Sequence, residues 1–136
     1  MRIPVIMKEV SAAIIIENDK VLLTRRAPNE KLAGYWEFPG GKRESGENIE
    51  ECLVRELKEE LDIKVEASGI FGESEYQYDG GSILLIGVRA RILNGTPTLS
   101  VHDAFEWVPL SLVHQYKLAP ADIPLATKLV EEYGKS

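Results

Sequence analysis

Three glutamates, Glu56, Glu59 and Glu60, lie three and four residues apart in one stretch of the chain. In a helix, side chains at this spacing share a face, so the three carboxylates would point the same way. Like charges this close repel by roughly 0.2–0.5 kcal/mol per exposed pair, and by more as water is excluded. A cation should offset that repulsion. Clustered hard oxygen ligands suit Mg²⁺ or Mn²⁺, so the spacing predicts a divalent metal site.

The glutamates belong to a helix predicted over residues 48–61. Asn48, followed three residues later by Glu51, is typical of a capping box at a helix start. Glu56 and Glu60 border an apolar stripe. The stripe consists of Leu53, Leu57 and Leu61. The carboxylates are therefore expected to be half turned toward the body of the protein, just after two glycines, Gly40-Gly41.

Composition narrows the class of protein. With 136 residues, 44% of them hydrophobic and 28% charged, the chain is expected to form a single soluble globular domain over 1–136. A net charge of −6 argues against a nucleic-acid polymer or a membrane surface as partner. Cys52 is the one cysteine, which excludes an internal disulfide and a Cys-rich zinc site. No apolar run approaches the ~20 residues of a membrane span, and the expected location is the cytoplasm.

Strand patterns surround the helix. Strands are predicted at residues 10–16, 21–24, 35–38, 63–65, 70–78, 82–93 and 104–108, and further helices from 109 and over 122–133. Asn18-Asp19, Asp79-Gly80-Gly81 and Asn94-Gly95 are typical of hairpin turns. His102 and His114 are expected in loops or at the surface, without a zinc role. This order of elements predicts a mixed α/β or α+β sandwich.

A long gapped motif runs through the glutamate stretch. It comprises Gly41, Glu47, Arg55-Glu56-Leu57, Glu59-Glu60 and Ile63. This pattern resembles the Nudix box, the signature of hydrolases that act on nucleoside diphosphates linked to another group. One specified position departs from it: Asp62 stands where the family has glycine. Asp62 follows the predicted helix end, where a left-handed residue is common, and Asp tolerates that conformation better than most residues.

The resemblance extends over most of the chain. The segments Arg25-Arg26, Trp36 to Gly41, Glu106-Trp107 and Ala119 to Asp122 resemble MutT-like members of the Nudix family. The stretch 118–124 is similar to that of bacterial CTP pyrophosphohydrolases. The resemblance implies an α/β/α sandwich with a mixed central sheet. It also implies Mg²⁺-dependent cleavage (Mn²⁺ may substitute) of a nucleoside triphosphate, of CTP or dCTP type or oxidised like 8-oxo-dGTP, to monophosphate and pyrophosphate.

The resemblance also implies roles for single residues. The implied metal ligands are the Gly40 carbonyl, Glu56, Glu59, Glu60 and Glu106, with Glu59 the most central and Glu106 a ligand or a general base. Glu47 and Arg55 resemble a partly structural catalytic pair, in which Arg55 holds carboxylates by charge-assisted hydrogen bonds. Arg26 and Lys42 are candidates for phosphate contacts.

Two interpretations of Asp122 stay open. The resemblance places it at the edge of the base, where an ionised carboxylate would need donors such as the N4 amino group of cytosine or the edge of guanine or 8-oxoguanine. It could equally cap the helix that follows. Phe38, with its aromatic neighbours Tyr35 and Trp36, could stack on the base or belong to the core.

Two alternative functions remain. The substrate could be another nucleoside diphosphate derivative, such as ADP-ribose, or the domain could be a non-catalytic nucleotide sensor. The presence of Glu56, Glu59 and Glu60 together favours an enzyme. A monomer and a homodimer are both compatible with the sequence.

Overall fold

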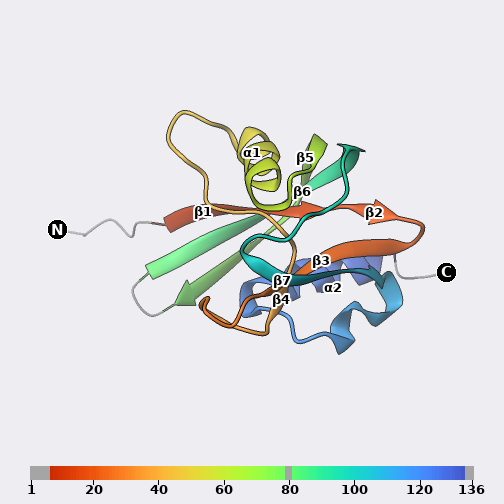
Figure 1. Cartoon of the computed structure of the whole chain (residues 1–136). Helices are drawn as coiled ribbons and strands as arrows, with labels where there is room; N and C mark the ends of the chain where they lie inside the picture. The colour runs from red at the N-terminus through yellow and green to blue at the C-terminus, as the bar shows by residue number, and fades with distance from the viewer. Residues whose placement is uncertain (1–6, 79–80, 134–136) are drawn as a thin grey trace.

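The computed structural model describes residues 7–78 and 81–133, whose strands form two sheets (Figure 1). In the first, the order is β1-β6-β5. Its strands are β1 (Met7–Ile14), parallel to β6 (Gly81–Asn94), and β5 (Lys64–Tyr78), antiparallel to β6. In the second, β3 (Lys20–Arg26) pairs with β2 (Ile16–Glu17), β4 (Trp36–Glu37) and β7 (His102–Pro109).

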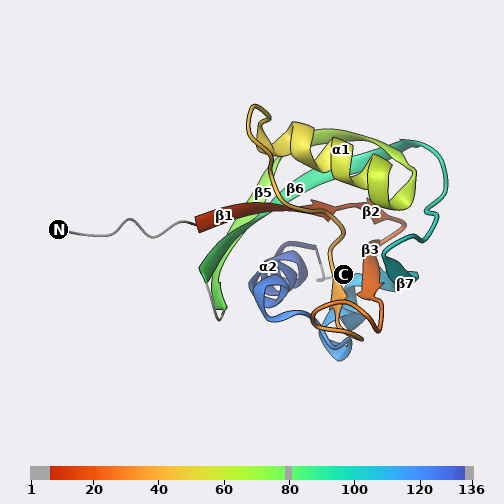
Figure 2. The ribbon, with the colours of Figure 1, turned by 60° about the vertical axis from the view of Figure 1, so that its left-hand side comes forward.

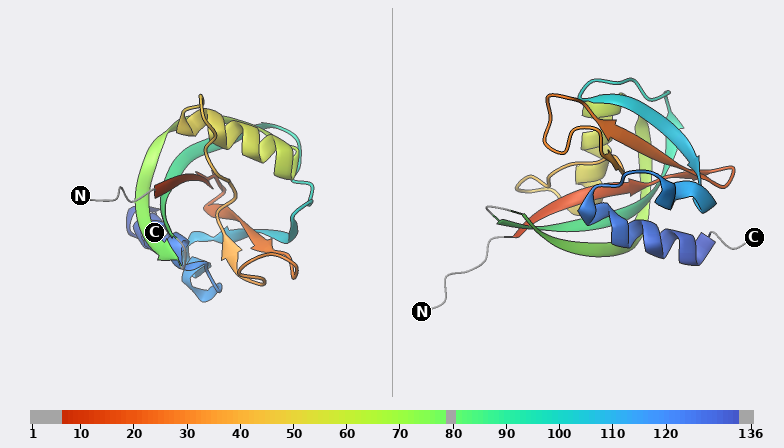
Figure 3. Two further views of the ribbon diagram at one scale, coloured as in Figure 1. Left: turned by 90° about the vertical axis from the view of Figure 1, so that its left-hand side faces the viewer. Right: turned by 90° about the horizontal axis from the view of Figure 1, so that it is seen from below.

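Helices cover opposite sides of the strands. Helix α1 (Ile49–Leu61) packs against β1, β5 and β6, and α2 (Ile123–Tyr133) packs against β5 and two 3₁₀ segments, η1 (Leu110–Gln115) and η2 (Pro120–Asp122). Figure 2 shows α1 and α2 on the two sides of the β1-β6-β5 sheet. Figure 3 shows the β5–β6 ribbon curving around the side of the molecule from α1 toward α2. The predicted α/β/α sandwich with a mixed sheet is confirmed.

Strand alternation explains the two apolar clusters. Ala12 and Ile14 belong to the cluster under α2, whereas Ala13 and Ile15 belong to the cluster under α1. Successive strand side chains point to opposite faces, so a strand covered on both sides must be apolar throughout. The predicted stripe of α1 is fully buried in the second cluster, at Leu53, Leu57 and Leu61.

Local signals in the sequence are confirmed at both ends of α1 and at the first hairpin. Asn48 and Glu51 form the reciprocal capping box, with hydrogen bonds of 2.8 and 2.9 Å. Asp62 adopts the left-handed conformation at φ 52°. Asn18 and Asp19 are also left-handed, as a two-residue turn between twisted strands requires. Asp79 and Gly80 of the next predicted turn lie outside the described residues.

Two sequence predictions are wrong. The chain does not return along β6 after Asn94-Gly95, because β1 and β5 already occupy the edges of β6 over most of its length. The connection instead packs on the end of α1, where Ser100 Oγ donates to the Glu60 carbonyl at 2.8 Å, and β7 then pairs with β3. His102 is consequently a buried strand residue opposite Arg26, and not a loop or surface residue. None of the helices in the described ranges is long and apolar enough to cross a membrane.

Candidate active site

The two glycines are held against β1. Ser11 N donates to the Gly41 carbonyl at 2.8 Å, and Ala13 N donates to the Pro39 carbonyl at 2.7 Å. The carbonyl between them, that of Gly40, accepts no hydrogen bond from the residues that the structure describes. A Cβ at Gly40 would overlap the Ser11 carbonyl oxygen, so only glycine permits this approach. The Gly40 carbonyl is therefore available to a ligand.

Gly41 is pressed against α1 in the same way. A Cβ added to Gly41 would overlap the carboxyl group of Glu56. The Glu56 side chain is only 13% exposed, so its carboxylate lies between the helix and the glycine loop. The loop thus brings the free Gly40 carbonyl and the Glu56 carboxylate into one neighbourhood.

Arg55 connects the predicted carboxylates. Its guanidinium makes two bonds to Glu47, from Nε at 3.0 Å and from Nη2 at 2.7 Å. Its Nη1 donates to Glu56 at 2.9 Å and to Glu59 at 3.2 Å, and its Nη2 reaches the Lys42 carbonyl at 3.1 Å. The hydrogen bonds from Arg55, followed by one from the Glu44 backbone, lower the pKa of Glu47 to about 2. Arg55 is therefore a clamp between the loop and the helix.

Glu60 completes the helix set in a more buried position. Burial first, and then repulsion from Glu56 and Glu37, raise the pKa of Glu60 to about 8. Arg26 opposes this effect, but only partly. Negative charge is therefore in excess around Glu60, which favours a proton or a cation there.

Glu37 belongs to this site, although reasoning from the sequence assigned it no role. It accepts from Arg26 Nε at 2.9 and 3.1 Å, and burial raises its pKa. Glu37 lies in strand β4, where it pairs with Thr24 of β3. From this position the charge of its carboxyl group raises the pKa of Glu60. The one available signal was its place beside Pro39 and Gly40 in the MutT-like segment.

The donors present fit a hard divalent cation. Glu56, Glu59 and Glu60 offer carboxylate oxygens, and Gly40 adds a carbonyl oxygen, the ligands that Mg²⁺ and Mn²⁺ prefer. Within residues 7–78 and 81–133, no three His, Cys, Asp or Glu side chains already stand in chelating positions. Arg55 instead holds Glu56 and Glu59. The close approach of Gly41 to the Glu56 carboxyl supports the fit, and repulsion from Glu56, after burial, raises the pKa of neighbouring Glu60.

The structure does not bring Glu106 to the glutamates of α1. Its neighbours Phe105 and Trp107 pack in the cluster under α1, so Glu106 points to the opposite face of β7. There its carboxylate accepts a short hydrogen bond from the hydroxyl of Tyr116. The expected link between Glu106 and the α1 carboxylates is absent from this arrangement.

Asp122 is linked to the glycine loop and not to its own helix. Its Oδ2 accepts from Phe38 N at 2.9 Å, and its side chain is almost fully buried. Burial, then repulsion from Glu37, raise the pKa of Asp122 well above its ordinary value. Among the described residues its Oδ1 accepts no hydrogen bond, yet this atom is not sealed from solvent. Oδ1 is thus left for a ligand, while a helix-capping bond is not what the structure shows.

The remaining candidates differ in what they can offer a substrate. Phe38 is 3% exposed and lies in the apolar cluster with Trp36, so its ring belongs to the core and is not open for stacking on a base. The Arg26 side chain is 36% exposed beyond its ion pair with Glu37, and the Lys42 side chain is exposed. Both cations remain accessible to phosphate.

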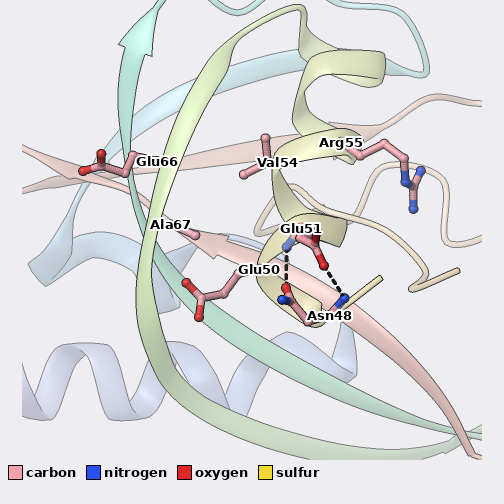
Figure 4. A pocket seen from close by; sticks show the side chains of 7 residues that line it. All are labelled: Asn48, Glu50, Glu51, Val54, Arg55, Glu66 and Ala67. Atoms are coloured by element: carbon pink, nitrogen blue, oxygen red, sulfur yellow. Dashed lines mark hydrogen bonds between the residues drawn. The ribbon is translucent and has the colours of Figure 1, made fainter. Parts of the chain in front are cut away.

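A separate depression of about 570 Å³ lies between the start of α1 and β5 (Figure 4). It is lined by Asn48, Glu50, Glu51, Val54, Arg55, Glu66 and Ala67. Figure 4 shows the capping-box bonds between Asn48 and Glu51 and the Arg55 side chain extending away from Glu66 and Ala67. The depression shares Arg55 with the candidate site, but the carboxylates that Arg55 holds, Glu47, Glu56 and Glu59, do not line it.

Comparisons with known proteins identify the family of the chain. The sequence profile of the NUDIX domain matches residues 7–129. The chain is 40% identical over 119 residues to a CTP pyrophosphohydrolase of Escherichia coli (strain K12), covering 88% of each protein. It is 34% identical over 126 residues to an 8-oxo-dGTP diphosphatase of that strain, covering 90% of this chain and 98% of the relative. A crystal structure of a MutT protein from Methanosarcina mazei Go1 matches this chain with a TM-score of 0.86 at 25% identity. The match covers 98% of this chain and 100% of the MutT chain.

Proposed function

The chain belongs to the NUDIX family of hydrolases, and on this basis we propose that it cleaves a (deoxy)nucleoside triphosphate to the monophosphate and pyrophosphate with Mg²⁺. The observation that carries this proposal is the packing of the Gly40-Gly41 loop against the carboxyl of Glu56, which Arg55 holds and Glu60 neighbours. The names of the two Escherichia coli relatives point to a nucleotide of cytosine or oxidised guanine type.

Four groups would hold the metal ion: the Gly40 carbonyl and the carboxylates of Glu56, Glu59 and Glu60. NUDIX hydrolases generally use a divalent metal, and Mn²⁺ should replace Mg²⁺ in this oxygen-rich set. When bound, the ion neutralises polyphosphate charge and lowers the pKa of a coordinated water.

The side chains around the metal have separate tasks. Arg55 binds Glu47, Glu56 and Glu59 by charge-assisted hydrogen bonds, which keeps these carboxylates beside the glycine loop. Glu59 is 59% exposed and held by a single ion pair of 3.2 Å. Of the three α1 carboxylates it is therefore the one least restrained from turning toward a metal ion.

Phosphate recognition would fall to the accessible cations. Glu37 holds Arg26 by its Nε and leaves part of the guanidinium exposed, and Lys42 follows the glycine loop directly. A polyphosphate carries several negative charges that these side chains can neutralise away from the metal.

Base recognition would use Asp122. Its Oδ1 accepts no hydrogen bond from the described residues and can accept one from an N–H group of the base. Cytosine presents a donor and an acceptor side by side at N4 and N3, and the guanine edge offers a comparable pair. Both candidate bases therefore suit Oδ1, the oxygen of Asp122 that Phe38 leaves free.

The function is tested with a substrate panel in Mg²⁺: CTP, dCTP, 5-methyl-dCTP, 8-oxo-dGTP, dGTP and ADP-ribose, with separate detection of phosphate and pyrophosphate. We expect pyrophosphate from at least one triphosphate, and its loss in a double Glu56→Gln, Glu60→Gln variant. Glu131→Gln, an exposed change on α2, is the matched control. Hydrolysis of ADP-ribose alone, nucleotide binding without turnover, or activity that survives the double substitution would each overturn the proposal.

A further inference from the structure

Ser11 lies where three parts of the candidate site meet. It is 1% exposed on β1, against both the glycine loop and Cys52 of α1. Its hydroxyl donates to the Gly41 carbonyl at 3.1 Å and accepts from Gly41 N at 3.2 Å and from the Cys52 thiol at 3.4 Å. One proton and two lone pairs are thereby used in full. The Ser11 hydroxyl is therefore buried and uses all of its hydrogen-bonding capacity.

The bond from Gly41 N to this hydroxyl has a geometric consequence. In a planar trans peptide, the N–H of one residue and the C=O of the residue before it point in opposite directions. With the Gly41 N–H directed at Ser11 Oγ, the Gly40 carbonyl must point away from β1. The second tie, from Ser11 N to the Gly41 carbonyl at 2.8 Å, fixes the next peptide plane. Ser11 therefore sets the direction of the Gly40 oxygen.

Cys52 extends this control to the helix. Its thiol lies 3.4 Å from Ser11 Oγ and equally 3.4 Å from the Gly41 carbonyl. Cys52 precedes Glu56 by one helical turn, and side chains four residues apart lie on the same face. The contacts of Ser11 and Cys52 consequently hold Gly41 beside the turn of α1 where a Cβ on Gly41 would overlap the Glu56 carboxyl.

We propose that Ser11 is a positioning residue that sets the metal affinity of the site, by holding the Gly40 carbonyl in the ligand direction and in register with Glu56. This proposal rests on the proposed function, since it takes the Gly40 carbonyl as a metal ligand. Loss of a group that orients a ligand typically lowers metal affinity about 10–100-fold.

The test is direct Mn²⁺ titration by electron paramagnetic resonance without nucleotide, so no turnover is needed. Ser11→Ala should weaken Mn²⁺ binding about 10-fold. Ser74→Ala removes the same hydroxyl from another buried strand serine, on β5, and should leave binding unchanged. Amide hydrogen exchange at Gly41 should be faster in Ser11→Ala than in the native chain and unchanged in Ser74→Ala. Equal Mn²⁺ affinity in folded Ser11→Ala and Ser74→Ala would overturn the proposal.

A second pair of variants covers the case in which Ser11→Ala does not fold. Thr and Val at position 11 have nearly the same shape and differ in the hydroxyl. Ser11→Thr should bind Mn²⁺ about 10-fold more tightly than Ser11→Val, and equal affinities would refute the role of the hydroxyl. Failure of the proposed function would give a different result from failure of the Ser11 proposal. The native chain would still bind Mn²⁺ with this same dependence on position 11, but it would hydrolyse no triphosphate in the panel.

Discussion

Asp122 Oδ2 lies 2.9 Å from the backbone nitrogen of Phe38, a residue 84 positions earlier in the chain. Phe38 immediately follows Glu37, which influences Glu60, and precedes Pro39-Gly40. Four consecutive residues, 37–40, therefore connect the group proposed to read the base with the groups proposed to hold the metal.

Asp122→Asn should change the choice of base without loosening the fold. An amide oxygen can still accept from Phe38 N, and the substitution removes a carboxyl whose pKa burial raises, so the melting temperature should stay the same or rise. The ratio of kcat/KM between CTP and 8-oxo-dGTP should shift about 10-fold or more, because one buried hydrogen bond to the base is altered. An unchanged ranking of substrates would remove Asp122 from base recognition. Asp103→Asn, at an exposed ion pair with Arg25, is the control.

Glu37→Gln and Glu106→Gln should differ sharply in effect. Glu37 lies beside Glu60 and holds Arg26, whereas Glu106 bonds to Tyr116 on the other face of β7. We expect kcat to fall about 10–100-fold in Glu37→Gln and less than about 3-fold in Glu106→Gln, measured at saturating Mg²⁺. The reverse order would mean that Glu106 moves to the metal when substrate is bound.

Arg55→Lys should be a severe change despite conserving charge. A lysine cannot make the paired bonds to Glu47 and still reach Glu56 and Glu59. The expected outcome is a fall in kcat of about 10-fold or more with a weaker apparent affinity for Mg²⁺. Arg91→Lys makes the same change at an exposed pair with Glu66 on the β5–β6 ribbon and should retain full activity. Similar rates in the two variants would show that the clamp is dispensable.

The metal-free protein should become less stable as pH rises from about 4.5 to about 8. The pKa of Glu60 is raised from 4.5 to about 8 in the folded state, so over this window the folded protein keeps a proton that the unfolded chain has lost. Folding stability contributed by that proton is present below the unfolded pKa and is lost by the upper end of the window. Melting temperatures in EDTA at pH 5, 6.5 and 8 measure the decline, and Mg²⁺ should reverse it at pH 8.

Glu60→Gln isolates this contribution, because Glu37 and Asp122 also have raised pKa values and push stability in the same direction. The variant should show a shallower decline than the native chain, with a higher melting temperature at pH 8 in EDTA. Identical slopes in the two proteins would assign the pH dependence to other groups.

Features that depend on neighbouring residues could be predicted from the sequence. The Asn48–Glu51 capping box, the left-handed Asp62 and the buried leucine face of α1 each arise within a few residues, where periodicity and capping rules apply. The link from Arg55 to Glu47 also followed, because both residues belong to one motif.

Features that depend on pairing between distant segments could not be predicted from the sequence. β7 pairs with β3 across some 80 positions of chain, and nothing near Gly95 indicates that partner. The same pairing buries His102 and turns Glu106 away from α1, since strand parity decides the face of each side chain. Glu37 lies in a strand of two residues, too short for a period to show which way it points.

The groups proposed to read the base and to hold the metal come from opposite layers of the sandwich: Asp122 from η2, and Glu56, Glu59 and Glu60 from α1. If the proposed roles hold, a substitution in η2 would alter which nucleotide is accepted and leave the hydrolytic groups in place. Such a division lets gene duplicates diverge in substrate range one residue at a time, each step leaving a working catalyst for selection to act upon.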